Sequence, residues 1–428
     1  MKLLFLTPQI PYPPRQGTAL RNWGLISHLA QRHEVWLLAF ADPPAPKTWP
    51  AELSAVCRNI ATFPLPIRSG QQRLKTLVAS NLPDMAWRLW SPEFAAQFQA
   101  WTHEQQFDII QVEGIELARY AISSESLGLS PQSLGRDADH SGPRTRRPAL
   151  VFDDHNCEYL MQKRWFERDI KNPRRWHAAL YSLAQWRKLA AFERTMIQQA
   201  QATLCCSAED RTALMALDPR FDPHIIFNGI DVDAYANAMI KSPNSKLKFS
   251  DAPPTLVFTG KMDFRPNIDA MLWFGSQVWP RIRQTQPHAR WLIVGQKPSP
   301  RLDGLRADPN IEITGEVADP RPFIAQASVY IAPLRVGGGT RFKLMEAMAL
   351  RKPIVTTRLG CEGFDIAPGR EMMVADAPGD FAAAVIALLK QPEQAQAMTE
   401  RAFAFVSQQY DWSVIVPKLE KIYERYVS

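Results

Sequence analysis

The 428-residue sequence lacks several features that would each assign it to a class of protein. No run of 18 apolar residues occurs, so the sequence predicts no membrane-spanning helix. The five cysteines are an odd number without paired-ligand spacing, which argues against a disulfide framework and favours buried thiols in a reducing compartment. The first apolar stretch, Leu3–Leu6, is too short for a secretion signal. Together these absences predict a cytoplasmic protein.

A strong charge of one sign is also absent. The chain has 50 Lys and Arg residues against 43 Asp and Glu residues, a net charge of +7. The excess is spread evenly, because the part up to Ile225 has 26 basic and 22 acidic residues. A mild and even excess gives no basic module of the kind that binds nucleic acid. We therefore expect no nucleic-acid partner.

Short apolar runs alternate with longer helical patterns along the whole chain. Most of these runs are continuous, which is typical of strands buried on both faces, and helices between such strands imply parallel sheets. Two series of this kind predict an α/β protein with two Rossmann-like, doubly wound domains. The expected strands are residues 3–6, 35–40, 60–65, 109–112, 150–152, 203–206 and 225–227, then 256–259, 291–294, 311–314, 329–331, 354–356 and 372–374.

Two polar segments indicate the domain organisation. Lys241–Pro254 is rich in Ser and Pro and follows the turn Asn228–Asp231, which predicts a linker and a first domain over residues 1–227. Residues 123–148 contain almost no large apolar side chain and are typical of a mobile surface insertion.

A glycine-rich turn, Gly337–Thr340, follows the expected strand 329–331 and precedes a helix. Free backbone N–H groups at a helix start, with no Cβ in the way, form a seat for phosphate or diphosphate. The alternative is a tight turn without a ligand. Glu346 lies about two turns into that helix, where an acidic group suits ribose or sugar hydroxyls, unless it is simply solvated.

A second turn, Gly260–Asn267, follows the expected strand 256–259 and precedes a helix expected from Ile268. It has two cations, Lys261 and Arg265, which would stabilise a departing diphosphate beside a helix N-terminus. The alternative is a surface salt-bridge turn. A third turn has one glycine, Gly17, before a helix.

A fourth polar turn, Asp153–Glu158, follows the expected strand 150–152. His155 in this turn is a candidate for catalysis or sugar binding, and a turn cap is the alternative. We expect no metal, because no distant cluster completes a ligand set with Asp153, His155 and Glu158. Ligands of α/β sheets bind at the carboxyl ends of the strands, so sheets that face each other would place all four turns in one cleft.

Several motifs together are similar to one known family. They are Gly315–Val317, Pro333–Ala349, Lys352–Thr357 and Gly360–Gly363, with Asn228–Asp231 similar to a hinge motif, and the loop Pro11–Gly17 and Arg32–Val35 similar to an acceptor domain. In these motifs the chain resembles retaining glycosyltransferases of family four. It is most similar to bacterial sugar transferases encoded with exopolysaccharide and exosortase systems, in which Asp-x-His-Asn-x-Glu and Gly-Gly-Gly-Thr-Arg recur.

The resemblance implies the fold called GT-B, in which two Rossmann-like domains face a cleft. Residues 228–407 would bind the donor, and a final helix over residues 408–428 would cross back to the first domain. The implied reaction, of hexosyltransferase type, moves a sugar from a UDP- or GDP-linked donor to the hydroxyl of a glycan or lipid-linked acceptor, with retention. Exopolysaccharide or other surface glycan synthesis is the implied process, and neither a cofactor nor a metal is implied.

By the same resemblance, Lys261 and Arg265 would contact the donor diphosphate and take part in catalysis. Glu346 would hold the nucleotide ribose, and Gly17 would approach the phosphate from the first domain. The full set of expected donor-binding residues is Gly17, Lys261, Arg265, Gly338, Gly339, Thr340, Lys343 and Glu346.

Two positions depart from the family pattern. Many members have a glutamate eight residues before the position of Glu346, but here that residue is Gly338. A histidine common after the fourth strand of the first domain is replaced by Glu113. Either His155 or Glu113 would therefore act near the reacting carbon, and the sequence leaves both open.

Three other activities and one further partner stay open at this stage. The activities are a nucleotide-sugar epimerase, an inverting GT-B transferase and a catalytically dead nucleotide-sugar-binding protein, which Gly338 favours. The partner is the inner face of the cytoplasmic membrane, because residues 159–200 contain nine Lys and Arg residues, three Asp and Glu residues, and Trp165, Trp176 and Trp186. The alternative is that these tryptophans pack inside the first domain.

Overall fold

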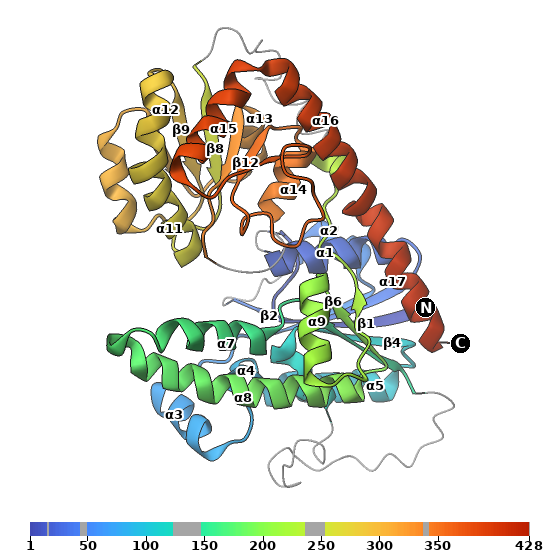
Figure 1. The fold of residues 1–428 in the computed structure, drawn as a ribbon. Helices are drawn as coiled ribbons and strands as arrows, with labels where there is room; N and C mark the ends of the chain where they lie inside the picture. Colours follow the sequence, from blue (N-terminus) through green and yellow to red (C-terminus); the bar gives the residue numbers. More distant parts are fainter. Residues whose placement is uncertain (15–16, 43–48, 123–146, 236–252, 337–341, 428) are drawn as a thin grey trace. The chain divides into compact units, whose positions relative to one another are not determined.

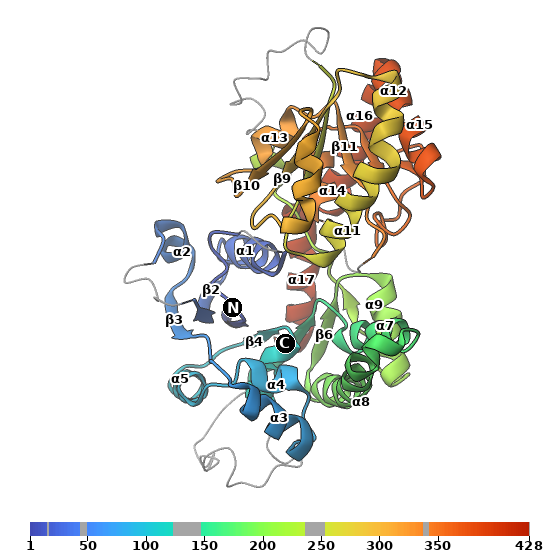
Figure 2. The same cartoon turned by 90° about the vertical axis from the view of Figure 1, so that its left-hand side faces the viewer.

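The chain forms two compact units in a computed structural model that describes residues 1–14, 17–42, 49–122, 147–235, 253–336 and 342–427 (Figures 1 and 2). The first unit consists of Met1–Phe227 together with Ile415–Ser428, and the second of Asn228–Val414. Each unit has one sheet, and every strand pairing described in either sheet is parallel.

The first unit has a seven-stranded sheet in the order β3-β2-β1-β4-β5-β6-β7. Its strands are β1 (Lys2–Thr7), β2 (Glu34–Ala41), β3 (Asn59–Pro64), β4 (Ile109–Glu113), β5 (Ala149–Asp154), β6 (Ala202–Cys205) and β7 (His224–Ile225). Its helices are α1 (Gly17–Leu29), α2 (Ala51–Val56), α3 (Gly70–Ala79), α4 (Asp84–Arg88), α5 (Pro92–Glu104), η1 (Ile115–Leu117), α6 (Ala118–Ala121), α7 (Glu158–Asp169), η3 (Pro173–Arg175), α8 (Trp176–Gln199) and α9 (Ala208–Leu217). In Figure 1, α7 runs along α8.

The second unit has a six-stranded sheet in the order β10-β9-β8-β11-β12-β13. Its strands are β8 (Thr255–Thr259), β9 (Arg290–Val294), β10 (Ile311–Gly315), β11 (Val329–Ala332), β12 (Ile354–Thr356) and β13 (Met373–Val374). Its helices are α11 (Arg265–Trp273), η5 (Phe274–Val278), α12 (Trp279–Thr285), η6 (Pro300–Ala307), α13 (Arg321–Ala325), α14 (Phe342–Ala349), α15 (Pro378–Lys390) and α16 (Pro392–Gln409). A last helix, α17 (Trp412–Val427), begins in the second unit and ends in the first.

Burial explains why the apolar runs form strands. Leu3, Leu4, Phe5 and Leu6 of β1 are all fully buried, although alternate side chains of a strand point to opposite faces of its sheet. Both faces of the sheet are therefore covered, as the continuous apolar runs predict. The fold class predicted from the sequence, two Rossmann-like α/β domains, is confirmed.

One helix boundary predicted from the sequence was wrong. We expected a helix from Ile268, whereas α11 begins at Arg265. Pro266 lies in the first turn, where its fixed φ favours helix formation and its missing N–H group costs no hydrogen bond. Two other predictions, the insertion over residues 123–148 and the linker over residues 241–254, lie almost entirely outside the described residues.

Candidate functional site

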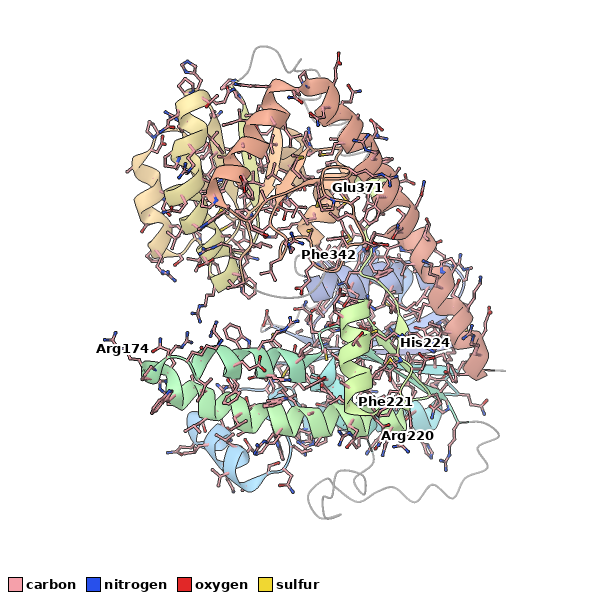
Figure 3. The ribbon with its side chains drawn as sticks, viewed as in Figure 1. Arg174, Arg220, Phe221, His224, Phe342 and Glu371 are labelled. Carbon is pink, nitrogen blue, oxygen red and sulfur yellow. The ribbon has the colours of Figure 1, made fainter. Side chains whose placement is uncertain are left out.

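The carboxyl edge of the second sheet brings positive side chains to the starts of two helices. Lys261 lies two residues after the end of β8 and forms an ion pair with Asp263, with 3.6 Å between Nζ and Oδ2. Arg265 is exposed and is the first residue of α11, and Lys343 lies in the first turn of α14. Phe342, labelled in Figure 3, begins α14. Because helix N-termini also carry positive partial charge, this edge suits an anion.

Asn267 holds two of these residues in place. Its buried side-chain amide donates to the backbone oxygen of Lys261 at 2.9 Å and accepts from Nζ of Lys343 at 3.1 Å. A Cβ added to Gly260 would lie 2.8 Å from the Asn267 amide nitrogen and 3.0 Å from Nζ of Lys343. Gly260 therefore leaves room for this network, and any larger residue would displace it.

Glu346 is partly buried on α14, so it is not the simply solvated residue that one alternative predicted. The hydroxyl of Tyr235 donates to Oε1 of Glu346 at 2.7 Å. Burial raises the pKa of the Glu346 carboxyl, while the Tyr235 hydrogen bond and the charge of Lys343 act against the rise. The guanidinium of Arg321 lies 5.7 Å from the centre of the Tyr235 ring.

Four more of the expected donor-binding residues are glycines or a threonine in turns that the sequence predicts. Gly338, Gly339 and Thr340 lie outside the described residues. Gly17 is exposed at the first residue of α1, after the carboxyl end of β1.

The carboxyl edge of the first sheet is acidic. Glu113, the last residue of β4, pairs in register with Asp153 of β5, and both side chains are fully buried. Asp154, the next residue of β5, is also buried. Parallel pairing thus places acidic side chains from two neighbouring strands at the same edge of the sheet.

One arginine neutralises part of this acidic edge. Arg21 of α1 donates from Nε at 2.9 Å and from Nη2 at 2.7 Å to Oδ2 of Asp153. Its Nη1 donates to the backbone oxygens of Ile226 at 3.0 Å and Phe227 at 3.1 Å. Burial opposes the charge of Arg21, but the carboxylate of Asp153 raises its pKa overall, so the guanidinium stays charged. Arg21 therefore joins α1, β5 and the end of the first unit's sheet.

His155 lies directly after β5 and belongs to the same cluster. One potential ligand atom each from Glu113, Asp153 and His155 lies within 4.8 Å of the other two. Gly114 makes room for the imidazole: its φ is +87°, and a Cβ there would lie 3.2 Å from Cε1 of His155. The two residues between which the sequence left the choice open, His155 and Glu113, are brought together.

Burial and charge shift the protonation of this cluster. Burial and then the charge of Asp153 raise the pKa of Glu113 well above its ordinary value, against the opposing effects of Arg21 and Gln111. Burial lowers the pKa of His155, which favours the neutral imidazole. Burial also raises the pKa of Glu158, at the start of α7, to about 8. Shifts of this kind are common at functional sites.

Comparison with known proteins decides the family. The family model described as "Glycosyltransferase Family 4" matches residues 16–234, and the model described as "Glycosyl transferases group 1" matches residues 253–391. The chain belongs to glycosyltransferase family 4. The first match covers β2 to β7 of the first sheet, and the second match covers most of the second unit.

Individual relatives of this family-4 chain match part of its length. The phosphatidyl-myo-inositol mannosyltransferase of Mycobacterium tuberculosis is 28% identical over 208 residues, which are 46% of this chain and 52% of the relative. An uncharacterized 44.6 kDa protein in the cps region of Klebsiella pneumoniae is 23% identical over 36% of this chain and 42% of the relative. The chain thus matches about half the length of these curated relatives.

Solved structures share the fold over nearly the whole chain. HepE from Anabaena, solved in complex with UDP and glucose, has a TM-score of 0.64 and 16% identity, with 99% of both chains covered. Sucrose-phosphate synthase from Thermosynechococcus elongatus has a TM-score of 0.67 and 15% identity, with 99% of both chains covered. At such low identity these likenesses show the GT-B fold of two Rossmann-like domains.

Sequence reasoning missed Arg21, Tyr235 and Asn267. Asn267 is the last residue of the turn Gly260–Asn267, so its polar side chain could have indicated a role at this site. Arg21 lies 132 positions from Asp153, and Tyr235 lies 111 positions from Glu346. The sequence predicts no distant partner that completes a ligand set with Asp153, His155 and Glu158, whereas Glu113 offers a ligand atom within 4.8 Å of those of Asp153 and His155.

Replacing Arg21 tests its role at the acidic edge. Arg21→Met leaves Asp153 buried without its cation, which typically costs about 3–5 kcal/mol in the free energy of unfolding. Denaturant unfolding of the full chain measures the change. Lys163→Met is the control, because Lys163 and Glu167 form an exposed pair on α7 and such pairs contribute at most about 1 kcal/mol. Equal losses in the two variants would contradict the assignment.

Proposed function

We propose that this family-4 chain transfers a hexose from a nucleotide-diphosphate sugar to an acceptor hydroxyl. The observation that carries the proposal is the positive edge of the second sheet, where Lys261, Arg265 and Lys343 lie at the starts of α11 and α14. Transfer leaves a nucleoside diphosphate, whose extra negative charge these cations and helix N-termini would stabilise in the transition state. A metal ion is not required at the diphosphate in this arrangement.

The donor and the acceptor are proposed from the chemistry of the site and its relatives. The carboxylate of Glu346 would accept hydrogen bonds from the ribose hydroxyls, which requires the Tyr235 hydroxyl to yield its place or to share the carboxylate. HepE was solved with UDP and glucose, which supports a UDP-linked sugar, while a GDP-linked sugar fits the same diphosphate site. One relative is a phosphatidyl-myo-inositol mannosyltransferase, and phosphatidyl-myo-inositol is a lipid. This relative supports a lipid-linked acceptor for surface glycan synthesis.

Removing either cation tests the donor site. Lys261→Ala and Arg265→Ala should each lower kcat/KM by an amount that corresponds to about 2–4 kcal/mol of lost transition-state stabilisation, the size of one lost electrostatic donor. Release of nucleoside diphosphate in the presence of acceptor measures the change. Arg281→Ala, an exposed arginine on α12 of the same unit, is the control and should keep normal turnover. Near-normal kcat/KM in both Lys261→Ala and Arg265→Ala would rule the donor site out.

The stereochemistry separates the proposal from its rivals. We propose retention, so proton NMR of a freshly formed product should show the anomeric configuration of the donor sugar. Inverted configuration would assign the chain to inverting transfer instead. An altered nucleotide sugar without transfer would indicate an epimerase, and bound but unaltered donor would indicate a binding protein.

We also propose that the first unit contacts an anionic membrane. Of the three tryptophans that led to this idea, Trp186 packs partly buried against the core, whereas Trp176 at the start of α8 is 55% exposed. Arg174, two residues before Trp176 in the sequence, points away from the ribbon in Figure 3. Leu180 and Tyr181, one turn further along α8, are also exposed. This end of α8 therefore presents apolar and basic side chains together.

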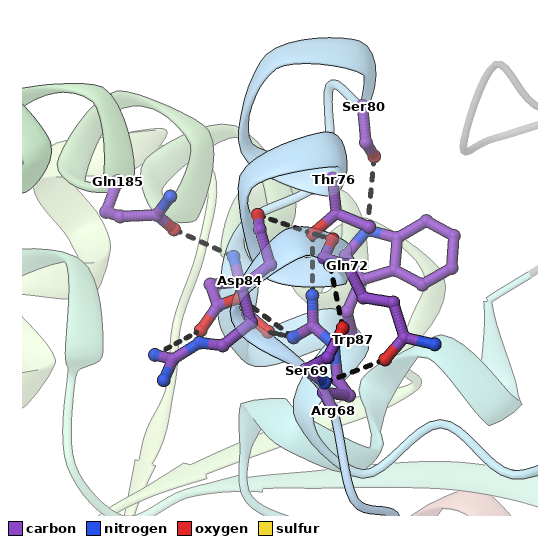
Figure 4. Close-up of polar contacts among 9 residues, drawn as sticks. Arg68, Ser69, Gln72, Thr76, Ser80, Asp84, Trp87 and Gln185 are labelled. Atoms are coloured by element: carbon purple, nitrogen blue, oxygen red, sulfur yellow. Dashed lines mark hydrogen bonds and ion pairs between the residues drawn. The ribbon is translucent and has the colours of Figure 1, made fainter.

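Helix α3 extends the same surface. Lys188 of α8 donates from Nζ to the backbone oxygens of Leu77 and Ser80 at 2.6 and 2.7 Å, and Asp84 of α4 accepts from Arg68 at 2.8 Å (Figure 4). These bonds hold α3 against α4 and α8, yet apolar side chains of this segment stay exposed. We define the α3–α8 surface by its exposed apolar residues Ile67, Leu74, Val78, Trp176 and Leu180.

The composition of the α3–α8 surface suits a bilayer with negative headgroups. Arg73 and Lys75 lie on α3 beside its exposed apolar side chains, and Lys171 and Arg174 lie just before α8. Interfacial helices insert apolar side chains while their cations stay at the headgroups. No helix in the described chain is long and apolar enough to span a membrane, so the proposed contact is peripheral.

Vesicle flotation tests the membrane contact. The chain should float with phosphatidylglycerol-containing liposomes at low salt, and the double variant Leu74→Ser, Trp176→Ser should largely remain at the bottom of the gradient. Tyr426→Ser removes an exposed aromatic residue from α17, outside the α3–α8 surface, and should float normally. Absence of wild-type flotation at low salt would remove the proposal.

A further inference from the structure

Two carboxylates at the acidic edge of the first sheet each have one oxygen in a hydrogen bond. Oε1 of Glu113 accepts from the side-chain amide of Gln111, and that amide's oxygen accepts from the hydroxyl of Tyr423 on α17. Oδ2 of Asp153 accepts twice from Arg21. Each carboxylate is therefore fixed in orientation by a partner that uses only one of its oxygens.

The other oxygen of each carboxylate has no such partner. Oε2 of Glu113 and Oδ1 of Asp153 are buried and make no hydrogen bond with any residue that the structure describes. The same holds, within the described chain, for Nδ1 of His155. A polar atom buried without a partner costs about 1–3 kcal/mol, and the two carboxylate oxygens are acceptors, so the cluster points to a missing positive group or donor.

We propose that Glu113, Asp153 and His155 bind a divalent cation. Ligand atoms that lie 2.0–2.6 Å from one ion are no more than about 4–5 Å apart, and the three residues offer atoms within 4.8 Å of one another. Carboxylate and imidazole ligands together suit Mn²⁺ or Zn²⁺. Arg21 and Gln111 take the place of the hydrogen-bonding groups that orient metal-bound carboxylates in proteins.

The charge of the cluster agrees with an ion of this kind. With Glu113 and Asp153 both ionised around an ion, the two carboxylates, the Arg21 guanidinium and a neutral imidazole have one negative charge in total. The cation would then replace the mutual repulsion of Glu113 and Asp153 by attraction to a common centre. Arg21 does not fill this role, because both of its bonds to Asp153 go to Oδ2. The ion would take its remaining ligands from water or a substrate hydroxyl, whose pKa it would lower.

The site belongs to the first unit and the positive edge to the second, and cation binding by the site does not rest on the proposed transfer reaction. The rival explanation is a proton on Glu113 that is shared with Asp153. Both explanations neutralise the carboxylates, but only the first predicts a stoichiometric ion.

Calorimetric titration of the chelator-treated full chain with Mn²⁺ and with Zn²⁺, in separate experiments, tests the proposal. We expect one ion of at least one of these metals per wild-type chain, and a rise in thermal midpoint when that metal is added. Glu113→Gln keeps the size of the side chain and should weaken binding at least about tenfold. His155→Phe, which keeps an aromatic ring beside Gly114, should do the same.

Glu104→Gln is the control, because Glu104 is an exposed acid at the end of α5 in the same unit and lies outside the ligand group. It should bind the ion as the wild type does. The thermal midpoint without metal shows whether each variant is folded. If Glu113→Gln is not folded, the metal affinity of His155→Phe decides the outcome. Absence of stoichiometric binding of both metals to the wild type would overturn the proposal. Wild-type affinity in the folded ligand variants would also overturn it.

Discussion

Parallel strand pairing brings the chemistry of each unit to one edge of its sheet. In a parallel sheet all carboxyl ends lie on the same side, so residues that follow different strands meet there. Glu113 ends β4 and His155 follows the neighbouring strand β5, and the two belong to one ligand cluster. Lys261 and Lys343 come together by the same rule, one after β8 and the other at the start of the helix after β11. In an antiparallel pairing, the carboxyl ends of neighbouring strands would lie at opposite edges of the sheet, and the two residues of each pair would be far apart.

The two edges that result differ in charge, and the difference supports the separate roles that we propose for them. The second sheet presents cations and helix N-termini, which suit the diphosphate of a donor. The first sheet presents buried acids around Arg21, which would repel a diphosphate and suit hydroxyl groups or a cation. Glycosyl transfer needs both kinds of environment, because the leaving group is an anion and the acceptor is a hydroxyl.

The sequence predicts the strands well because burial on both faces leaves a plain signal. Ile354–Thr356 was expected as a strand and is found with the same bounds, and Leu3–Leu6 differs from β1 by one residue at each end. The family resemblance also predicts that Lys261 and Glu346 bind the donor, and this role stays a prediction. The structure has Lys261 in the turn after β8 and Glu346 on α14.

Contacts between distant positions could not be predicted in this way. The pairing of Tyr235 with Glu346 has no periodicity, and neither residue's type requires the other. The contact between Glu113 and Asp153 could not be predicted either. The family pattern singles out Glu113 as a substitute for a histidine but does not indicate that it lies beside Asp153. Only the register between β4 and β5 shows that these two carboxylates lie opposite each other.

The central claim is that a nucleotide diphosphate binds at the carboxyl edge of the second sheet. A crystal structure of the chain grown with UDP tests it most directly. We predict a diphosphate within hydrogen-bonding distance of the Lys261 and Arg265 side chains, with the ribose hydroxyls on Glu346. A nucleotide bound away from these residues, or no bound nucleotide at millimolar UDP and GDP, would contradict the account.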